Sequence, residues 1–113
     1  SHLVPDPPHV LFIASDPLLR NRVGEALCAG GFAPLLAVHA FDAASYMASA
    51  PTPVLIVIDV DSPGLDLGNL LGRFRADARW SRVRVVVTGS NVESPGRLGV
   101  NGVLPKPLDA GKG

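Results

Sequence analysis

The 113-residue sequence predicts one doubly wound α/β domain, in which a five-stranded parallel sheet carries helices on both faces. Three observations lead to this prediction. Continuous apolar runs of strand length suit parallel strands that are buried on both sides. Helix-prone segments alternate with these runs, and this alternation favours right-handed crossovers between parallel strands. Polar side chains follow four of the runs, and a parallel sheet collects its functional groups at such strand ends.

The first strand is predicted at residues 10–14, an uninterrupted apolar run. Asp16 and Pro17 are residue types preferred at the N-cap and the first position of a helix. Apolar residues four, seven and eight positions after Leu19 give this helix one apolar face. The glycine pair at 30–31 ends it, because glycine tolerates the left-handed conformation past a helix C-terminus.

Three further elements are predicted in the middle of the chain. Residues 32–38 form a second apolar segment, which we expect to be a strand. The alanine-rich stretch 41–50 favours a helix, and the prolines at positions 51 and 53 stop it. The strongest strand signal is 54–58, where four of the five residues are β-branched.

The last part of the chain is predicted to have reduced helices. An amphipathic helix runs from about Leu67 to residues 79–80, and a fourth strand follows at 83–88. Between 89 and 99 a proline, an asparagine and three glycines argue against a full helix, so the fourth helix shrinks to a turn. A short fifth strand is expected at 103–104, with no fifth helix after it.

Residues 9–109 are predicted to be the domain. Residues 1–8 are a leader, whose first two residues resemble an expression-tag remnant and whose prolines stiffen the rest, and 110–113 are a tail. Ten basic and ten acidic residues leave no electrostatic footprint for nucleic acid or an anionic membrane. A single cysteine, Cys28, excludes an intrachain disulfide. With no visible signal peptide and no membrane-length apolar run, this favours a cytoplasmic location.

Polar residues that suit phosphoryl chemistry follow the predicted strands. They are Ser15 and Asp16, Asp59 with Asp61, Thr88, and Lys106. A carboxylate can act as the nucleophile toward phosphorus. A hydroxyl group and an ammonium group can bind the phosphoryl oxygens, and a divalent cation can neutralise the developing charge. The sequence therefore predicts a phosphoryl-accepting site at the carboxyl edge of the sheet.

This ordered set resembles the receiver domain of two-component response regulators. Residues 59–66 resemble the phosphoacceptor loop of that family, with Asp59 in the place of the phosphoacceptor. Thr88 matches the hydroxyl position, and Lys106 with Pro107 matches the family lysine and the proline after it, a bond usually cis in the family. The resemblance covers about residues 9–109.

The resemblance implies a flavodoxin-like fold and a signalling role in a two-component phosphorelay. A histidine kinase or other signalling protein would donate the phosphoryl group to Asp59, and a partner or fused output domain would be switched. The only chemistry implied is self-phosphotransfer and autodephosphorylation on Asp59, with Thr88 and Lys106 contacting the phosphoryl group. No residue is expected to make the chain an enzyme in the usual sense.

The chain departs from the family pattern where magnesium is held. The usual pair of acids after the first strand falls on Ala14 and Ser15. Asp16, Asp59 and Asp61 remain as ligands for a Mg²⁺ site that we expect to be weak or lost, because Mg²⁺ prefers carboxylate and water oxygens. Asp16 has an alternative role as a helix N-cap.

One alternative to the phosphoacceptor role stays open, and a second is disfavoured. The chain could be a pseudo-receiver, a phosphorylation-independent module for protein–protein interaction, in which Lys106 pairs with Asp59 for structure and Thr88 is an ordinary strand-end residue. A small α/β enzyme or flavin-binding domain finds no support, because the sequence has no glycine-rich phosphate loop. With the fifth helix missing, we also expect a partner over the sheet face: a second copy, a swapped segment, or residues outside the given sequence.

Overall fold

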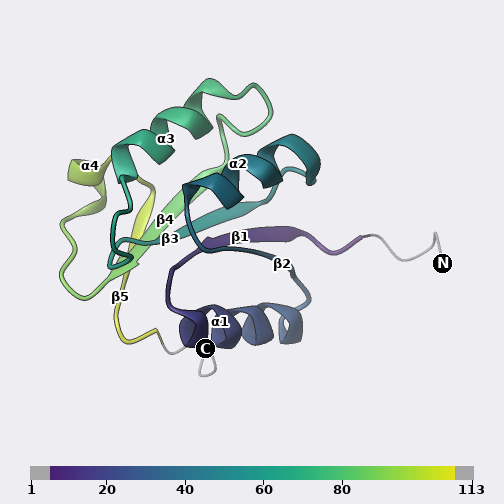
Figure 1. The fold of residues 1–113 in the computed structure, drawn as a ribbon, viewed down its shortest axis with the longest axis horizontal. Coiled ribbons are helices and arrows are strands. Elements are labelled where there is room, and N and C mark those ends of the chain that lie inside the picture. The colour runs from purple at the N-terminus through teal and green to yellow at the C-terminus, as the bar shows by residue number, and fades with distance from the viewer. Residues whose placement is uncertain (1–5, 109–113) are drawn as a thin grey trace.

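In the computed structural model, residues 6–108 are described, and strands and helices alternate along them (Figure 1). The elements are β1 (His9–Ile13), α1 (Pro17–Ala29), β2 (Ala33–Ala37), α2 (Ala40–Ser49), β3 (Leu55–Asp59), α3 (Leu67–Ala76), β4 (Arg84–Gly89), α4 (Pro95–Leu98) and β5 (Gly102–Pro105). All strands of the sheet are parallel, in the order β2-β1-β3-β4-β5. The predicted doubly wound α/β fold is confirmed.

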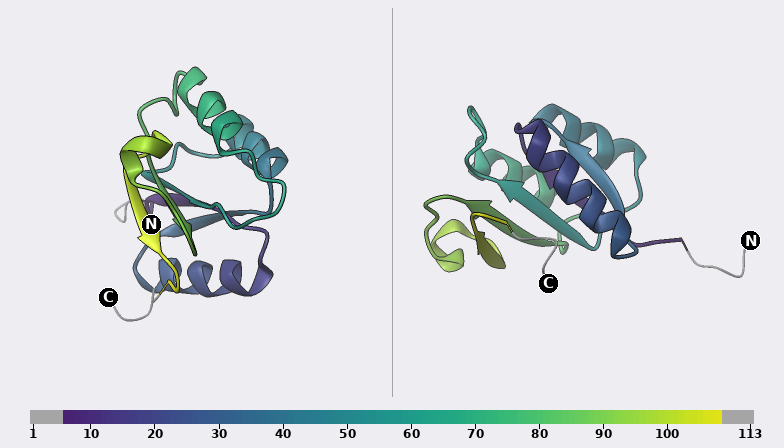
Figure 2. Two further views of the ribbon diagram at one scale, coloured as in Figure 1. Left: turned by 90° about the vertical axis from the view of Figure 1, so that its left-hand side faces the viewer. Right: turned by 90° about the horizontal axis from the view of Figure 1, so that it is seen from below.

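Helices lie on both faces of the sheet. Helix α1 covers one face, and α2 and α3 cover the other (Figures 1 and 2). On the α3 side, Leu70 and Phe74 are buried one helical turn apart, and the Phe74 ring stacks on Trp80 with centroids 6.0 Å apart. Burying such side chains contributes roughly 1.5–3 kcal/mol each, so this layer stabilises the packing of the helices on the sheet.

The first helix begins as its sequence predicts. The Asp16 side chain accepts hydrogen bonds from the backbone N–H groups of Leu18 at 3.0 Å and Leu19 at 3.4 Å. Pro17 takes the first helical position, where its missing N–H costs nothing. The turn after the helix places Gly31 at φ 88°, a conformation that side chains with a Cβ rarely adopt. Asp16 is therefore an N-cap in this structure.

Two predicted boundaries need correction. Helix α3 ends at Ala76 rather than near residues 79–80, because Asp77 starts a turn and accepts from the N–H groups of Arg79 and Trp80. That turn returns the indole of Trp80 to the core. The fifth strand, Gly102–Pro105, is longer than the two residues predicted.

The shortened fourth helix is confirmed. Helix α4 has a single turn of four residues, Pro95–Leu98. After β5, no helix is present in the described chain, which reaches residue 108. The expected tail at 110–113 and the tag remnant at 1–2 lie outside the described residues.

The sheet face beside α1 has better cover than the sequence suggests. An apolar groove of about 410 Å³ runs between α1 and the segment after β5, and its lining includes Phe12, Val57 and Leu104. Phe12 is buried and Val57 is only 8% exposed, while Leu104 is 44% exposed. The segment 104–108 therefore supplies part of the cover on this face, and the partner expected over it stays a prediction.

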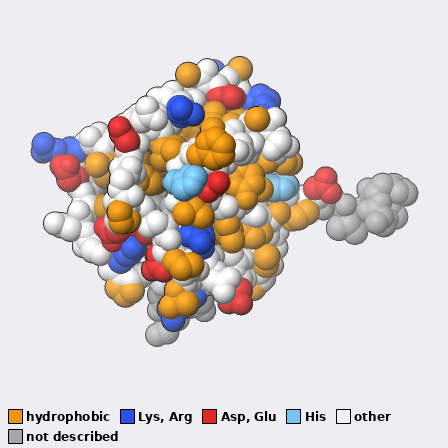
Figure 3. All heavy atoms as spheres, viewed as in Figure 1, with side chains coloured by type: hydrophobic (Ala, Val, Ile, Leu, Met, Phe, Trp, Pro, Cys, Tyr) orange, Lys and Arg blue, Asp and Glu red, His pale blue; other side chains and the backbone are white. Residues whose placement is uncertain are grey.

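Within residues 6–108, no helix is both long and apolar enough to cross a membrane. On the face seen in Figure 3, acidic and basic side chains are interspersed with hydrophobic ones. This mixture agrees with the zero formal net charge of the sequence.

Candidate functional site

The residues predicted to carry chemistry meet at the carboxyl edge of the sheet. Asp59 is the last residue of β3, and its register partner on β4 is Thr88. Lys106 follows β5 directly, and its backbone N–H donates to the Gly89 carbonyl at 3.2 Å. Because parallel strands end on the same side, three segments distant in sequence converge at this edge.

Asp59 and Lys106 form an ion pair at the base of the site. The Lys106 Nζ lies 3.1 Å from both Oδ1 and Oδ2 of Asp59. Asp59 is only 2% exposed, so this ammonium group replaces the water contacts that the carboxylate loses on burial. The Lys106–Pro107 peptide bond is cis, as the resemblance implied.

A second carboxylate shares the same lysine. The Asp61 Oδ2 lies 3.0 Å from the Lys106 Nζ. That oxygen also accepts from the Ser90 backbone N–H at 3.0 Å and from the Ser90 Oγ at 2.9 Å. The Asp61 backbone N–H in turn donates to the Asp59 Oδ1 at 3.0 Å, so the two carboxylates are joined through the loop.

These contacts shift two ionisation equilibria. The hydrogen bond from Lys106, followed by that from Ser90, holds the pKa of Asp61 below its ordinary value of 3.8. Burial alone would lower the pKa of Lys106, but its hydrogen bonds to Asp61 and Asp59 outweigh burial and raise the pKa above 10.5. Lys106 is therefore a permanent cation at neutral pH.

The Thr88 hydroxyl is a buried polar group beside Asp59. Thr88 is 0% exposed, and its Oγ1 has no hydrogen-bond partner within residues 6–108. A buried hydroxyl without a partner costs about 1–3 kcal/mol, so such groups call for an explanation. The register places it on the strand next to Asp59, where it can donate to an oxygen bound there.

Three site residues were missed by sequence reasoning. Ser90 donates twice to Asp61, and Gly89 makes room for that contact, because a Cβ there would lie 3.3 Å from the Asp61 Oδ1. Ser62 is buried, and its Oγ accepts from the Ser15 N–H at 3.0 Å, which ties the loop after β1 to the loop after β3. A polar residue just past a strand end was the available signal for Ser90.

The residues present do not fit a magnesium site of the usual receiver kind. In the described range 6–108, no three His, Cys, Asp or Glu side chains form a group that could hold a metal ion. Asp16 caps α1, and Ala14 and Ser15 supply no carboxylate. The carboxylates of Asp59 and Asp61 are both engaged by Lys106, so the local cation is an ammonium group.

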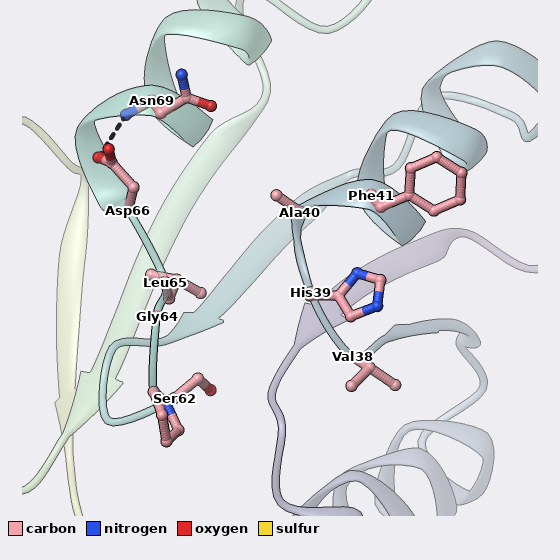
Figure 4. Close-up of a pocket in the computed structure, with 10 residues that line it drawn as sticks. Val38, His39, Ala40, Phe41, Ser62, Gly64, Leu65, Asp66 and Asn69 are labelled. Carbon is pink, nitrogen blue, oxygen red and sulfur yellow. Dashed lines mark hydrogen bonds between the residues drawn. The ribbon is translucent and has the colours of Figure 1, made fainter.

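A separate hollow of about 240 Å³ lies between the loops after β2 and β3 (Figure 4). The rings of His39 and Phe41 point away from the β3–α3 loop, with centroids 6.3 Å apart. Asp66 accepts from the Asn69 N–H at 3.0 Å as the N-cap of α3. The Asp66 carboxylate in this hollow therefore serves as a helix cap, and the hollow is distinct from the cluster around Asp59.

The chain matches known proteins in its three-dimensional structure rather than in its sequence. No family model matches the sequence, and none of the curated proteins matches it. Solved structures match well. The chemotaxis response regulator CheY4 of Vibrio cholerae has a TM-score of 0.79 at 17% identity, covering 92% of this chain and 90% of that one. This chain has the receiver-domain fold.

Two further receiver-fold matches extend the comparison. A sensor protein from Polaromonas sp. JS666 has a TM-score of 0.78 at 26% identity, covering 92% of this chain and 87% of that chain. The receiver domain of a sensor histidine kinase from Pseudomonas aeruginosa PAO1 has a TM-score of 0.79 at 20% identity, covering 94% and 90%. That structure holds a magnesium ion in its active-site cleft. The resemblance inferred from the sequence is thus confirmed for the fold.

Proposed function

We propose that this chain is a receiver-type signalling domain that accepts a phosphoryl group on Asp59. The observation that carries the proposal is the buried Asp59 carboxylate, paired with Lys106 and set beside the Thr88 hydroxyl, which has no hydrogen-bond partner among residues 6–108. Few structural roles need all three groups at one strand edge. A phosphoryl-accepting role uses each of them.

The transfer follows from the roles of these groups. One carboxylate oxygen of Asp59 attacks phosphorus and forms a P–O bond. The P–N bond of a phosphohistidine donor breaks, and its electron pair stays on the imidazole nitrogen, which then takes up a proton. Lys106 balances charge on the phosphoryl oxygens, and Thr88 donates to one of them. The acyl phosphate is later hydrolysed by water, which returns Asp59 to its carboxylate form.

Mass spectrometry after incubation with acetyl phosphate and Mg²⁺ tests this role. We expect the wild-type chain to gain one phosphoryl group and Asp59→Asn to gain none, because a neutral amide cannot replace the nucleophile. Asp66→Asn is the matched control, since asparagine also serves as an N-cap and the same charge is lost. Labelling of Asp59→Asn equal to the control would show that another group is the acceptor.

The partners that we propose are a histidine kinase or other signalling protein as donor and a partner or fused output domain as recipient, in the cytoplasm. The matched receiver domain of a sensor histidine kinase, and a matched signal receiver domain of an HD-domain-containing protein from Pseudomonas fluorescens, support this setting. A second copy is the alternative partner, at the groove that contains Leu104. Sedimentation over a concentration range tests it, with Leu104→Lys as the control variant.

The second candidate function is the pseudo-receiver, an interaction module that works without phosphorylation. The specific observation in its favour is that Ala14 and Ser15 stand where receiver domains usually carry acids, while Asp61 engages Lys106. In that case no phosphodonor labels the wild-type chain, although Asp59 and Lys106 still stabilise the fold.

A further inference from the structure

Asp61 makes the contacts that a phosphoryl oxygen would make. Its Oδ2 accepts from the Ser90 N–H at 3.0 Å, the Ser90 Oγ at 2.9 Å and the Lys106 Nζ at 3.0 Å. A backbone N–H, a hydroxyl and an ammonium group are the donors that proteins use to hold phosphoryl oxygens. One carboxylate oxygen of the chain itself therefore occupies a set of anion-binding donors.

In the unphosphorylated chain, three carboxylate oxygens surround the ammonium group of Lys106. A lysine ammonium group has three N–H donors. The Lys106 Nζ lies within 3.1 Å of Asp59 Oδ1, Asp59 Oδ2 and Asp61 Oδ2, which is one acceptor for each donor. In an acyl phosphate on Asp59, one of these oxygens becomes the bridging oxygen of the P–O bond, so the phosphoryl oxygens and the Asp61 Oδ2 then compete for the same ammonium group.

The backbone permits Asp61 to sit there. A Cβ at position 89 would lie 2.8 Å from the side chains of Val60 and Val92, and 3.3 Å from the Asp61 Oδ1. Glycine at this position leaves the space that lets the β3–α3 loop close against β4. The Asp61 side chain is 37% exposed, so it can also swing out into water.

Electrostatic repulsion would also favour the withdrawal of Asp61 once Asp59 carries a phosphoryl group. In the present state one ammonium group faces two carboxylates. Phosphorylation of Asp59 would replace one carboxylate with a group of about two negative charges, beside the negative charge of Asp61. Like charges at this range oppose each other, most strongly near a buried group.

We propose that Asp61 is a built-in anionic ligand of Lys106 and Ser90, which a phosphoryl group on Asp59 must displace. The inference rests on the proposed function of Asp59. It assigns to Asp61 a restraining effect on phosphorylation, in place of the magnesium-side role that the sequence resemblance implied for it.

Beryllofluoride, which mimics a phosphoryl group on an aspartate, tests the inference through amide NMR shifts of the intact chain at fixed Mg²⁺. Asp61→Asn keeps the shape of the side chain and removes its charge, so we expect it to bind beryllofluoride about tenfold more tightly than the wild type, equivalent to about 1.4 kcal/mol. Asp61→Ala should tighten binding as well. Asp66→Asn, which removes a charge from the same loop without touching Lys106, should match the wild type.

Each outcome of this experiment supports or overturns the inference. Equal or weaker binding by Asp61→Asn, with the wild type binding, overturns the inference and leaves the role of Asp59 intact. Equal tightening by Asp66→Asn also overturns it, because the effect would be general charge. If no variant binds beryllofluoride, the proposed function of Asp59 fails, and orthophosphate then decides. A shift of the Ser90 amide by orthophosphate in Asp61→Asn but not in the wild type supports the inference. No shift in either protein overturns it.

Discussion

The Lys106 Nζ lies 3.1 Å from each carboxylate oxygen of Asp59, although 47 residues separate them in the sequence. The pair joins the end of β3 to the segment after β5, across the intervening strand β4. Asp59 is buried, and the Lys106 side chain is 23% exposed. The lysine thus links a buried charge to the surface and fixes the last described segment to the sheet.

Removing the lysine charge should destabilise the fold. Lys106→Met leaves the buried carboxylate of Asp59 without its cation, and breaking a fully buried pair in this way costs about 3–5 kcal/mol. Because Lys106 is partly exposed, we expect a loss at or below the lower end of that range, measured by urea unfolding. The double variant Asp59→Asn/Lys106→Met removes both charges and should recover most of the loss. A double variant as unstable as Lys106→Met would contradict the pairing.

The stabilising effect of Asp61 should depend on acid pH. Because its pKa in the folded chain is below 3.8, ionised Asp61 stabilises the fold above that pH, and the effect is lost as the pH falls through the folded value. We expect the difference in unfolding free energy between the wild type and Asp61→Asn to be largest above pH 3.8 and to shrink below it. High salt should shrink it too, since Asp61 is partly exposed. A difference that is constant from neutral pH to pH 2 would count against these contacts.

Lys106 gives the opposite dependence at alkaline pH. Its folded pKa is above 10.5, so its contribution is complete below that value and is lost as the pH rises through the raised pKa. Unfolding free energies of the wild type and Lys106→Met should therefore converge only at strongly alkaline pH. Convergence already near pH 9 would mean that the lysine is not held by the two carboxylates.

Two glycine substitutions should have opposite effects on stability. A Cβ at Gly89 would lie 2.8 Å from branched valine side chains, so Gly89→Ala should cost about 1–3 kcal/mol through overpacking and should shift the amide signal of Ser90. Gly72→Ala is the control, because the position is on helix α3 and, apart from its chain neighbours and the backbone of its own helix, no atom of residues 6–108 lies within 4 Å of a Cβ placed there. There alanine should stabilise by about 0.5–1 kcal/mol. Stabilisation by both substitutions would contradict the overpacking, because it would show that the valine side chains around Gly89 move aside at little cost.

Magnesium should bind poorly. Asp59 and Asp61 are engaged by Lys106, and residues 14–15 supply no carboxylate, so amide shifts of the site should not saturate below roughly 10 mM Mg²⁺. Ser15→Asp adds a carboxylate at that loop and should tighten binding severalfold. Saturation of the wild type at low-millimolar Mg²⁺, centred on Asp59, would disprove this prediction.

The sequence was sufficient for the fold because its local signals agree. The β-branched run that became β3 has no competing helical pattern, and Asp16 with Pro17 marks the start of α1 unambiguously. The end of α3 was less predictable, since Ala76 and the residues after it carry no strong stop signal. The helix ends because the Asp77 side chain accepts hydrogen bonds from the backbone N–H groups of Arg79 and Trp80.

The strand-end residues of the site were predictable from the sequence, but the loop residues and their contacts were not. Strand-end positions were enough to group Asp59, Thr88 and Lys106, since parallel strands end on one side. The Asp61–Ser90 contact depends on how two loops approach, which periodicity does not encode. The sequence shows that positions 14 and 15 carry no carboxylate, but it does not show that Asp61 forms an ion pair with Lys106.

The parallel sheet also sets the order in which the molecule can be completed. Strand β3 lies between β1 and β4, and each parallel pairing must close a crossover rather than a hairpin. Contacts this distant in sequence slow folding. On a growing polypeptide, Asp59 leaves the ribosome well before Lys106, so its carboxylate must stay hydrated until the last strand joins β4. A ribosome-bound chain would therefore carry Asp59 without its cation, and the ion pair would form only in the finished sheet.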